Sequence, residues 1–360
     1  MTKKNTVDIK IRRLQIANYK GIDELDLYFP RPKMPDDPDV VVMGSRNGLG
    51  KTSVLECCAL LLIGLSGREY MFKLSRGGYL PVDMPEMIIR AGASIAQIEG
   101  EIVIGDMTII LGIAIHKSGT VKIKNKPEQN VQELLGRDET DIVENFISTV
   151  GGMSPDPLLS EYFLYFHSYR KVQEGNPELG MMVERGNIRH RVGYGPGYGV
   201  PMSTFKLRIL HSLMSRAKLF EDWSDEQSED VLTKLNEFVK RYAGGTIQKL
   251  RPSADNTVDF RIHPVDGGSS FTFDGLSSGQ KEIIATLFLI WYQTRDKPGV
   301  VLIDEPELHL NPEWHRDFIR QISKIAPKNQ YIIATHSEDV FDSVDEDQRF
   351  LLQNSTGSKS

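Results

Sequence analysis

The chain has 360 residues, of which 40% are hydrophobic and 26% are charged, and its formal net charge is −6. These values are ordinary for a soluble globular protein, and the length suits one large α/β domain with an added lobe or two modest domains. The longest apolar run, Cys57–Ile63, is much shorter than the roughly 20 residues that span a bilayer, so we expect no membrane partner. Net charge alone neither predicts nor forbids nucleic-acid binding.

The cysteine content and the first residues bear on location. Cys57 and Cys58 are the only cysteines and they are neighbours, which excludes a disulfide framework and a zinc ribbon. Residues 1–5 contain lysines with no apolar stretch behind them, so we expect no signal peptide. Both observations predict a cytoplasmic protein.

The first half of the chain is predicted to be rich in strands. Residues 8–28 alternate between apolar and polar positions, which indicates two strands with a turn near Lys20-Gly21. Val40–Met43 is an apolar strand that ends in a glycine-rich turn, and a buried helix is expected from about Lys51. Further on, the patterns predict an antiparallel sheet over 94–125, a helix over 129–148 and a strand at 163–166.

The second half mixes helices with short strands. Residues 186–201 are typical of a loop, and 203–243 are helical by pattern with a break at about 222–225. Strands are expected around 247–263 and 269–273, followed by alternating helices and strands that suggest parallel packing. The tail from Gln353 is polar and predicted to be disordered, and no internal repeat or coiled-coil heptad run is present in the sequence.

A glycine-rich segment, Gly44–Thr52, follows the apolar strand and precedes a helix. It matches the phosphate-loop pattern G-x-x-x-x-G-K-[ST] except that Ser45 replaces the first glycine. Backbone N–H groups of such a loop hold phosphate oxygens, Lys51 adds a positive charge, and the Thr52 hydroxyl binds Mg²⁺. The alternative is an incidental glycine turn. The residues expected to bind nucleotide are Ser45, Arg46, Asn47, Gly48, Gly50, Lys51, Thr52 and Ser53.

Two acids follow a second apolar run, Gly299–Ile303. In a phosphate-loop fold we expect this strand to lie beside the strand that ends at Gly44. Asp304 would then reach Mg²⁺, and Glu305 would act as the general base that activates water. The alternative is a strand that ends in solvated acids. Asn311-Pro312 is typical of a helix start.

A serine-glycine turn precedes another predicted helix. Its candidate residues are Ser277, Ser278, Gly279 and Gln280. The serine hydroxyls can cap the helix, or they can donate to a γ-phosphate. A chain with one phosphate loop and one such turn cannot readily place both on the same nucleotide, so we expect the turn to act on a second copy of the chain.

These motifs, in this order, resemble those of ABC-type ATPases. Gly44–Thr52 is similar to the Walker A motif, Leu276–Gln280 to the signature, Ile303–Glu305 to Walker B, and Ile332–Ser337 to the strand with the switch histidine. The resemblance implies ATP and Mg²⁺ as cofactors and a homodimer or larger oligomer. It also implies that His336 contacts the γ-phosphate and acts in catalysis with Lys51 and Glu305, whereas a lone histidine at a strand end would more often be structural.

Two further segments point to a branch of this group. Ile11–Ile22 resembles the first hairpin of the SMC, RecF and OLD group, and Pro306–Pro312 resembles OLD-like AAA ATPases of bacterial anti-phage defence, such as the ATPase subunits of PARIS or Septu. The missing heptads argue against SMC proteins. Because few residues follow His336, we expect no C-terminal nuclease of the kind that OLD proteins usually carry. The resemblance therefore implies a separate nuclease or toxin effector; a RecF-like DNA repair ATPase is the alternative.

Some assignments stay open. Arg170 or Gln173 resembles a Q-loop residue that approaches Mg²⁺ or phosphate, and a solvated loop is the alternative. Basic residues over 185–191 and 206–218 suit either DNA contact or a solvated face.

The expected fold is α/β, a P-loop NTPase of ABC type with an antiparallel β lobe and an inserted helical lobe. Its expected parts are 1–150 with Walker A and the β lobe, 151–265 as the inserted lobe, 266–350 with the signature, Walker B and the switch histidine, and 351–360 as the tail.

Overall fold

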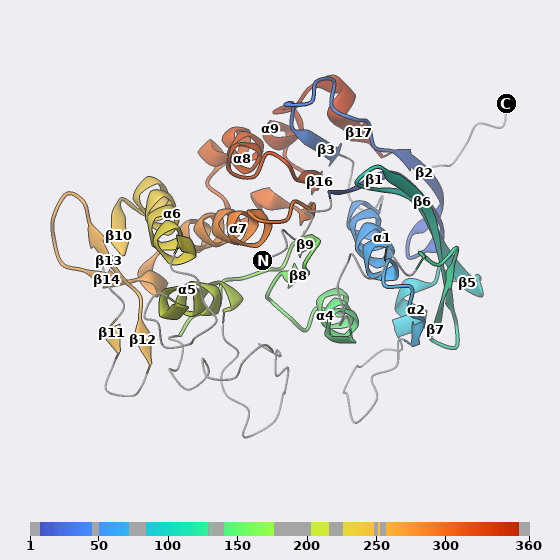
Figure 1. The fold of residues 1–360 in the computed structure, drawn as a ribbon, viewed down its shortest axis with the longest axis horizontal. Coiled ribbons are helices and arrows are strands. Elements are labelled where there is room, and N and C mark those ends of the chain that lie inside the picture. The colour runs from blue at the N-terminus through green and yellow to red at the C-terminus, as the bar shows by residue number, and fades with distance from the viewer. Residues whose placement is uncertain are drawn as a thin grey trace. The chain divides into compact units, whose positions relative to one another are not determined.

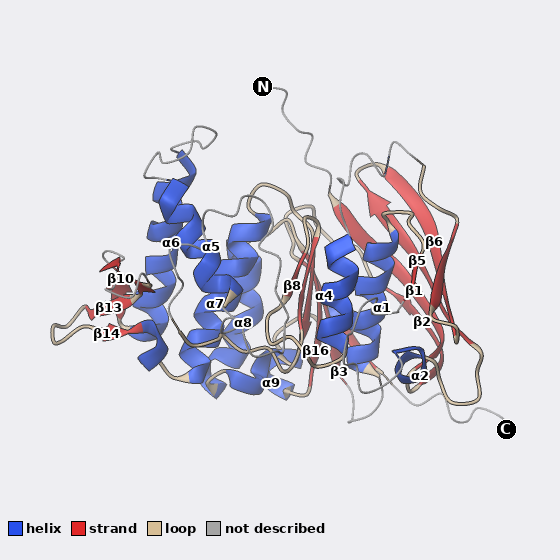
Figure 2. Ribbon diagram, turned by 90° about the horizontal axis from the view of Figure 1, so that it is seen from below, coloured by secondary structure: helices blue, strands red, loops and turns tan. Residues whose placement is uncertain are grey.

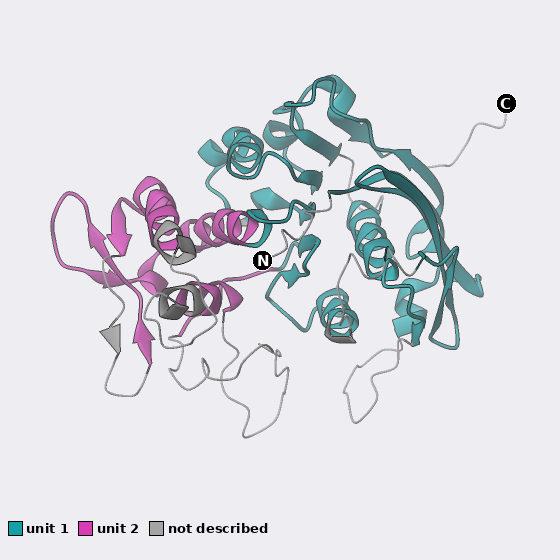
Figure 3. Cartoon of the chain, viewed as in Figure 1, with its two compact units in different colours: residues 1–169, 293–360 teal, residues 170–292 magenta. Residues whose placement is uncertain are grey.

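A computed structural model describes residues 8–44, 50–71, 84–128, 131, 140–175, 203–215, 226–247, 251–252 and 257–352. The chain divides into two compact units (Figure 3). Unit 1 comprises residues 1–169 and 293–360, and unit 2 comprises residues 170–292. The predicted boundaries at 150 and 265 therefore fall before the observed ones. The predicted loop at 186–201, the helix break at 222–225 and the tail from 353 lie outside the described residues.

The first sheet of unit 1 is antiparallel and has the strand order β2-β1-β5-β6-β7-β4. Alternate side chains of β5 and β7 are buried, and this is the pattern of a sheet with one face on a core. The hairpin with its turn at Lys20-Gly21 and the sheet over 94–125 were both predicted correctly. The strands are β1 (Ile9–Tyr19), β2 (Ile22–Tyr28), β4 (Tyr70–Met71), β5 (Ile95–Ile104), β6 (Met107–His116) and β7 (Thr120–Lys124).

The second sheet of unit 1 has the order β17-β3-β16-β15-β9-β8 and is parallel except for β8. Every residue of β3, β15, β16 and β9 is buried, as expected for parallel strands that are covered on both faces. The strands are β3 (Asp39–Gly44), β8 (Leu158–Leu159), β9 (Phe163–Phe166), β15 (Val300–Asp304), β16 (Gln330–Thr335) and β17 (Arg349–Leu351).

The order of these strands corrects one prediction. β15, which carries Asp304, does not lie beside β3; β16 lies between them and pairs with both. The segment that connects two parallel strands can cross over another strand of the sheet. Motifs that follow one another along the chain therefore need not lie on adjacent strands. The consequence is that the strand ending before His336 occupies the centre of the site.

Helix α1 (Lys51–Gly64) lies between the two sheets (Figures 1 and 2) and contacts strands of both. All of its residues except Thr52 are buried, because apolar neighbours surround the helix on every side. Cys57 and Cys58 belong to this core, as predicted, and burial raises the pKa of both thiols above the usual value.

Of the remaining helical segments of unit 1, α9 contacts β3 and β16, and α4 contacts β8. Asn311 caps α8 by accepting the N–H of Glu313, with Pro312 as the first helical residue, and both were predicted. The segments are α2 (Met84–Ile88), α4 (Thr140–Val150), η3 (Pro306–His309), α8 (Pro312–Ile325), α9 (Glu338–Phe341) and η4 (Glu346–Gln348).

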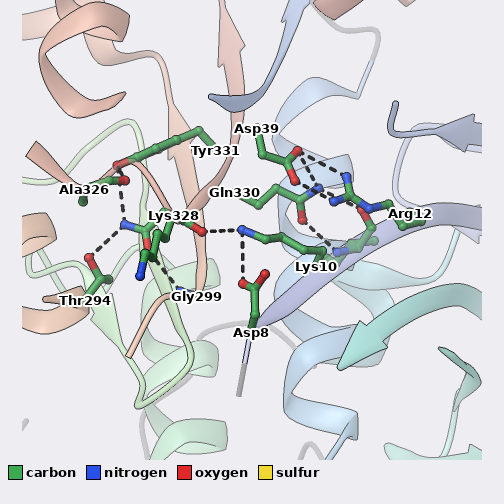
Figure 4. A network of polar contacts seen from close by, with 12 residues as sticks. Asp8, Lys10, Arg12, Asp39, Thr294, Gly299, Ala326, Lys328, Gln330 and Tyr331 are labelled. Carbon is green, nitrogen blue, oxygen red and sulfur yellow. Dashed lines mark hydrogen bonds and ion pairs between the residues drawn. The ribbon is translucent and has the colours of Figure 1, made fainter. Parts of the chain in front are cut away.

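A polar network joins the two sheets at the end opposite the phosphate loop (Figure 4). The Gln330 side chain, at the start of β16, accepts the N–H of Ile11 at 2.7 Å and donates to the Ile11 carbonyl at 2.9 Å. Beside it, Arg12 binds both carboxylate oxygens of Asp39, at 3.2 and 2.6 Å. The side chain of Gln330 thus makes with Ile11 the two backbone hydrogen bonds that a neighbouring strand would otherwise make. The register of β1 against β5 shifts at this point, between Ile11 and Arg13.

The described residues of unit 2 form three helices and short antiparallel strands. Its helices are α5 (Thr204–Ser215), α6 (Glu226–Ala243) and α7 (Ser278–Thr294), the last of which runs on into unit 1. Its strands are β10 (Gly245–Ile247), β11 (Arg251–Pro252), β12 (Val258–Asp259), β13 (Arg261–Pro264) and β14 (Phe271–Thr272), followed by the single turn η2 (Phe273–Gly275). In the described part of the chain, no helix has the length and apolarity needed to cross a membrane.

Candidate nucleotide site

The carboxyl ends of three parallel strands meet the start of α1 in unit 1. β3 ends at Gly44, β15 at Asp304 and β16 at Thr335, and their registers bring these ends level. Ligands of open parallel sheets bind at this edge, because the loops and helix N-termini there point out of the sheet. Gly44, Asp304 and the strand that leads to His336 therefore end at one edge, together with Lys51 and Thr52 at the start of α1.

The start of α1 shows why the phosphate loop needs its second glycine. Gly50 has φ of 90°, in the left-handed region, and a Cβ there would lie 2.8 Å from Cγ1 of Ile22. Lys51 and Ser53 follow in the first helical turn and are buried. Ser45, Arg46, Asn47 and Gly48, also predicted to bind nucleotide, lie outside the described residues.

Thr52 and Asp304 are in direct contact. The Thr52 hydroxyl donates to Oδ2 of Asp304 at 2.8 Å, and Asp304 is fully buried. Helix α1 packs on both β15 and β16, so its first turn reaches Asp304 across the intervening strand. A hydroxyl and a carboxylate fit Mg²⁺, which takes oxygen ligands and relies on substrate phosphates and water for the rest. Within the described ranges, no group of three or more His, Cys, Asp or Glu side chains forms a metal site.

Glu305 adopts a left-handed backbone conformation with φ of 45°, which is rare for a residue with a side chain. Its N–H still bonds to the Ala334 carbonyl at 2.8 Å, so the ladder with β16 continues one residue past the strand. Its carboxylate Oε1 lies 3.3 Å from Nε2 of His336. Backbone strain of this kind concentrates at functional sites and persists where the surrounding structure fixes it.

His336 also meets Lys51. The lysine ammonium lies 2.9 Å from Nε2 and 3.3 Å from Nδ1 of the imidazole. Nε2 therefore faces both a donor, the Lys51 ammonium, and an acceptor, the Glu305 carboxylate. Desolvation lowers the pKa of Lys51, while the carboxylates of Glu305, Asp304 and Glu307 act in the opposite direction.

Two features of this edge were missed by sequence reasoning. Glu307, on η3, accepts three hydrogen bonds from residues 335–337, at the end of β16 and just beyond it. Glu56 of α1 is buried and binds Lys20 at 2.6 Å and the Tyr19 hydroxyl at 3.0 Å, which ties the β1–β2 turn to α1; burial raises the pKa of Glu56. The sequence did contain a signal for each residue: Glu307 is an acid two residues after Glu305, and Glu56 is an acid inside an apolar helix.

The signature residues lie in unit 2. Ser277 and Gln280 cap α7 reciprocally: the Gln280 N–H donates to the Ser277 hydroxyl at 3.3 Å, and the Ser277 N–H to the Gln280 side chain at 3.0 Å. The Gln280 amide also donates to the Tyr242 carbonyl at 2.9 Å. Ser277 and Ser278 are exposed and Gly279 is half-buried. The helix-capping alternative is therefore present, and a hydroxyl that accepts one hydrogen bond retains its own hydrogen to donate.

Two of the open assignments concern residues of unit 2. Arg170 is buried and forms an ion pair of 2.8 Å with Glu282, so it is not on a solvated loop, while Gln173 is half-buried. Lys206 is also buried, with its ammonium bound to Asp274 and to the Gly175 carbonyl. Neither a solvated face nor DNA contact fits Lys206, although both were considered for 206–218; residues 185–191 lie outside the described ranges.

Comparison with protein families supports the class. Residues 164–342 match the family model described as "AAA domain, putative AbiEii toxin, Type IV TA system". Among solved structures, an SMC head bound to the C-winged helix domain of ScpA has a TM-score of 0.53 and 14% identity, with 93% of this chain and 92% of that chain covered. The chain thus has the α/β fold of a P-loop NTPase, like that of an SMC head, and residues 164–342 are similar to the AAA domain of that family model.

Three curated proteins are similar to this chain, each over only part of its own length. The Septu protein PtuA of Bacillus mycoides is 22% identical over 343 residues, which are 91% of this chain and 38% of that protein. The Retron Vc95 probable ATPase of Vibrio cholerae is 28% identical over 124 residues, which are 32% of this chain and 24% of that protein. An OLD nuclease of Thermus scotoductus is 38% identical over 60 residues, 16% of this chain and 11% of that protein. The chain therefore spans well under half the length of these relatives.

Proposed function

We propose that the chain binds and hydrolyses ATP at the edge where Lys51, Thr52, Asp304, Glu305 and His336 meet. The observation that carries this proposal is the chain of contacts from Thr52 to Asp304 and from Lys51 through His336 to Glu305. Lys51 sits on a flexible stem and can turn its ammonium towards β- and γ-phosphate oxygens. Glu305 holds the attacking water as general base, and His336 lies where it can contact the γ-phosphate.

Thr52 and Asp304 would hold Mg²⁺ in this site. When bound, Mg²⁺ neutralises charge on the β- and γ-phosphates of the nucleotide. The protein's own contribution is the geometry: Asp304 is fixed by the buried strand β15, and Thr52 by the first turn of α1.

The signature turn is proposed to act on the nucleotide of a second copy, so that ATP binding closes a head-to-tail homodimer and hydrolysis opens it. The support is the exposure of Ser277 and Ser278 at the N-terminus of α7, where backbone N–H groups and the helix dipole favour an anion. A dimer of this type contains two composite sites, each made from Walker A of one copy and the signature of the other.

A mixing experiment tests the composite site. We expect Lys51→Ala and Ser278→Arg each to abolish hydrolysis, because the first lacks the phosphate-binding cation and the second blocks the partner's nucleotide. An equimolar mixture should recover about a quarter of the wild-type rate, since half of its dimers contain one intact site out of two. Thr272→Arg, which changes an exposed side chain of β14, is the control and should stay active. A mixture that remains as inactive as its components contradicts the head-to-tail dimer.

We further propose that the switch controls a separate nuclease or toxin effector in anti-phage defence. The support is the set of resembling proteins, which includes a Septu protein and a retron ATPase. An affinity pull-down from the native host with Glu305→Gln and ATP should recover that effector, because this variant is expected to remain in the closed state. Recovery of recombination proteins or DNA alone would instead support the RecF-like alternative, as would strong stimulation of hydrolysis by gapped DNA.

A further inference from the structure

Glu307 holds the segment that carries His336. Its carboxylate Oε1 accepts the backbone N–H of His336 at 2.6 Å and that of Ser337 at 3.1 Å. Oε2 accepts the Thr335 hydroxyl at 2.8 Å. One side chain from η3 therefore fixes three consecutive residues, at the point where β16 ends and the paired ladder no longer constrains the backbone.

The chemistry of these contacts demands an acceptor. Two of the three partners are backbone N–H groups, which only donate. The third, the Thr335 hydroxyl, already accepts the Ser337 N–H at 3.0 Å, so its hydrogen points to Glu307. An ionised carboxylate is acceptor-only and matches all three donors.

The far side of the same segment is also fixed. The Ser337 hydroxyl caps α9 by accepting the Val340 N–H at 3.4 Å, and it lies 3.3 Å from Nδ1 of His315. Between these two anchors, the His336 side chain is the part that reaches Lys51 and Glu305. The imidazole position is therefore set by the backbone that Glu307 holds.

We propose that Glu307 is a positioning residue for ATP hydrolysis: it fixes the backbone at residues 335–337 so that His336 meets Lys51 and Glu305. This inference rests on the proposed function of the same site. Because Glu307 acts through the backbone that carries His336, its loss should affect turnover more than nucleotide binding.

The test compares Glu307→Ala with Glu307→Gln in the full chain. Glu307→Ala should lower kcat about 10- to 100-fold, as expected when a catalytic group is misplaced by about 1 Å, and leave KM within about 3-fold. Glu307→Gln should restore most of kcat. Its amide oxygen can accept both N–H groups, and its NH₂ can donate to the remaining lone pair of the Thr335 oxygen once the hydroxyl hydrogen has rotated away, so the geometry survives without the charge. Glu313→Ala, an exposed acid in the first turn of α8, should behave as wild type.

Amide hydrogen exchange of the nucleotide-free protein gives a second readout. The amides of His336 and Ser337 should exchange at least about 10-fold faster in Glu307→Ala than in wild type, and near the wild-type rate in Glu307→Gln. Unchanged exchange in Glu307→Ala, or a Gln variant as slow in turnover as the Ala variant, overturns the positioning role, the latter by assigning the effect to charge. Wild-type protein without any ATP hydrolysis refutes the proposed function instead, whatever the exchange rates show.

Discussion

Glu305→Gln is expected to lower the rate of ATP hydrolysis by a factor of about 10² to 10⁴ while ATP remains bound, because the amide cannot accept the proton of the attacking water. The side chain keeps its shape, and its oxygen can still accept from Nε2 of His336, now 3.3 Å from the carboxylate. The measurement is phosphate release under saturating ATP and Mg²⁺, together with equilibrium binding of a fluorescent ATP analogue.

Glu338→Gln is the matched control, because Glu338 is an exposed acid in the first turn of α9, two residues after His336. It should hydrolyse ATP at the wild-type rate. If Glu305→Gln retains more than about a tenth of wild-type turnover, Glu305 is not the general base, since a general base typically contributes at least about 100-fold.

Gln330→Ala is expected to reduce the free energy of unfolding by about 3 kcal/mol, since a buried polar group left without its partner costs about 1–3 kcal/mol. Gln330 is fully buried and satisfies both the N–H and the carbonyl of Ile11. Alanine removes both bonds and leaves a void between the two sheets of unit 1. Urea denaturation followed by circular dichroism measures the change.

Gln97→Ala serves as the control for that measurement. Gln97 lies on β5 with its side chain exposed, so its loss should change the free energy of unfolding by less than about 0.5 kcal/mol. Equal effects of the two substitutions would show that Gln330 does not hold the sheets together.

Much of unit 1 was predictable because its elements carry strong local patterns. The alternation in Ile9–Tyr28 predicts the hairpin, and the apolar runs at 40–43, 163–166 and 300–303 predict buried strands. The order of the parallel strands was not predictable. Both β15 and β16 are apolar runs that end in polar residues, and nothing in their side chains specifies which one pairs with β3.

The candidate site, too, was predictable only in part. The sequence predicted a site made of Lys51, Thr52, Asp304, Glu305 and His336, because each of these residues stands at the end of an apolar strand or at the start of a helix. Glu307 was missed because its role depends on the short turn η3, which follows a left-handed residue that no local pattern specifies. The reciprocal cap of Ser277 and Gln280 was predictable in kind, since serine followed three residues later by glutamine is a capping pattern.

The two ends of strand β16 are held by different kinds of contact. The strand is only six residues long, about 20 Å. At its start, the side chain of Gln330 binds the backbone of Ile11 in the other sheet. Its tip carries His336, beyond the last paired residue. At that end the backbone is held by the side chain of Glu307 and no longer by pairing with a neighbouring strand. Substitutions at the Gln330 end should lower the melting temperature and leave the turnover of the folded protein unchanged. Substitutions at the His336 end should lower turnover and leave the melting temperature unchanged. Selection for stability and selection for activity therefore act on opposite ends of one strand.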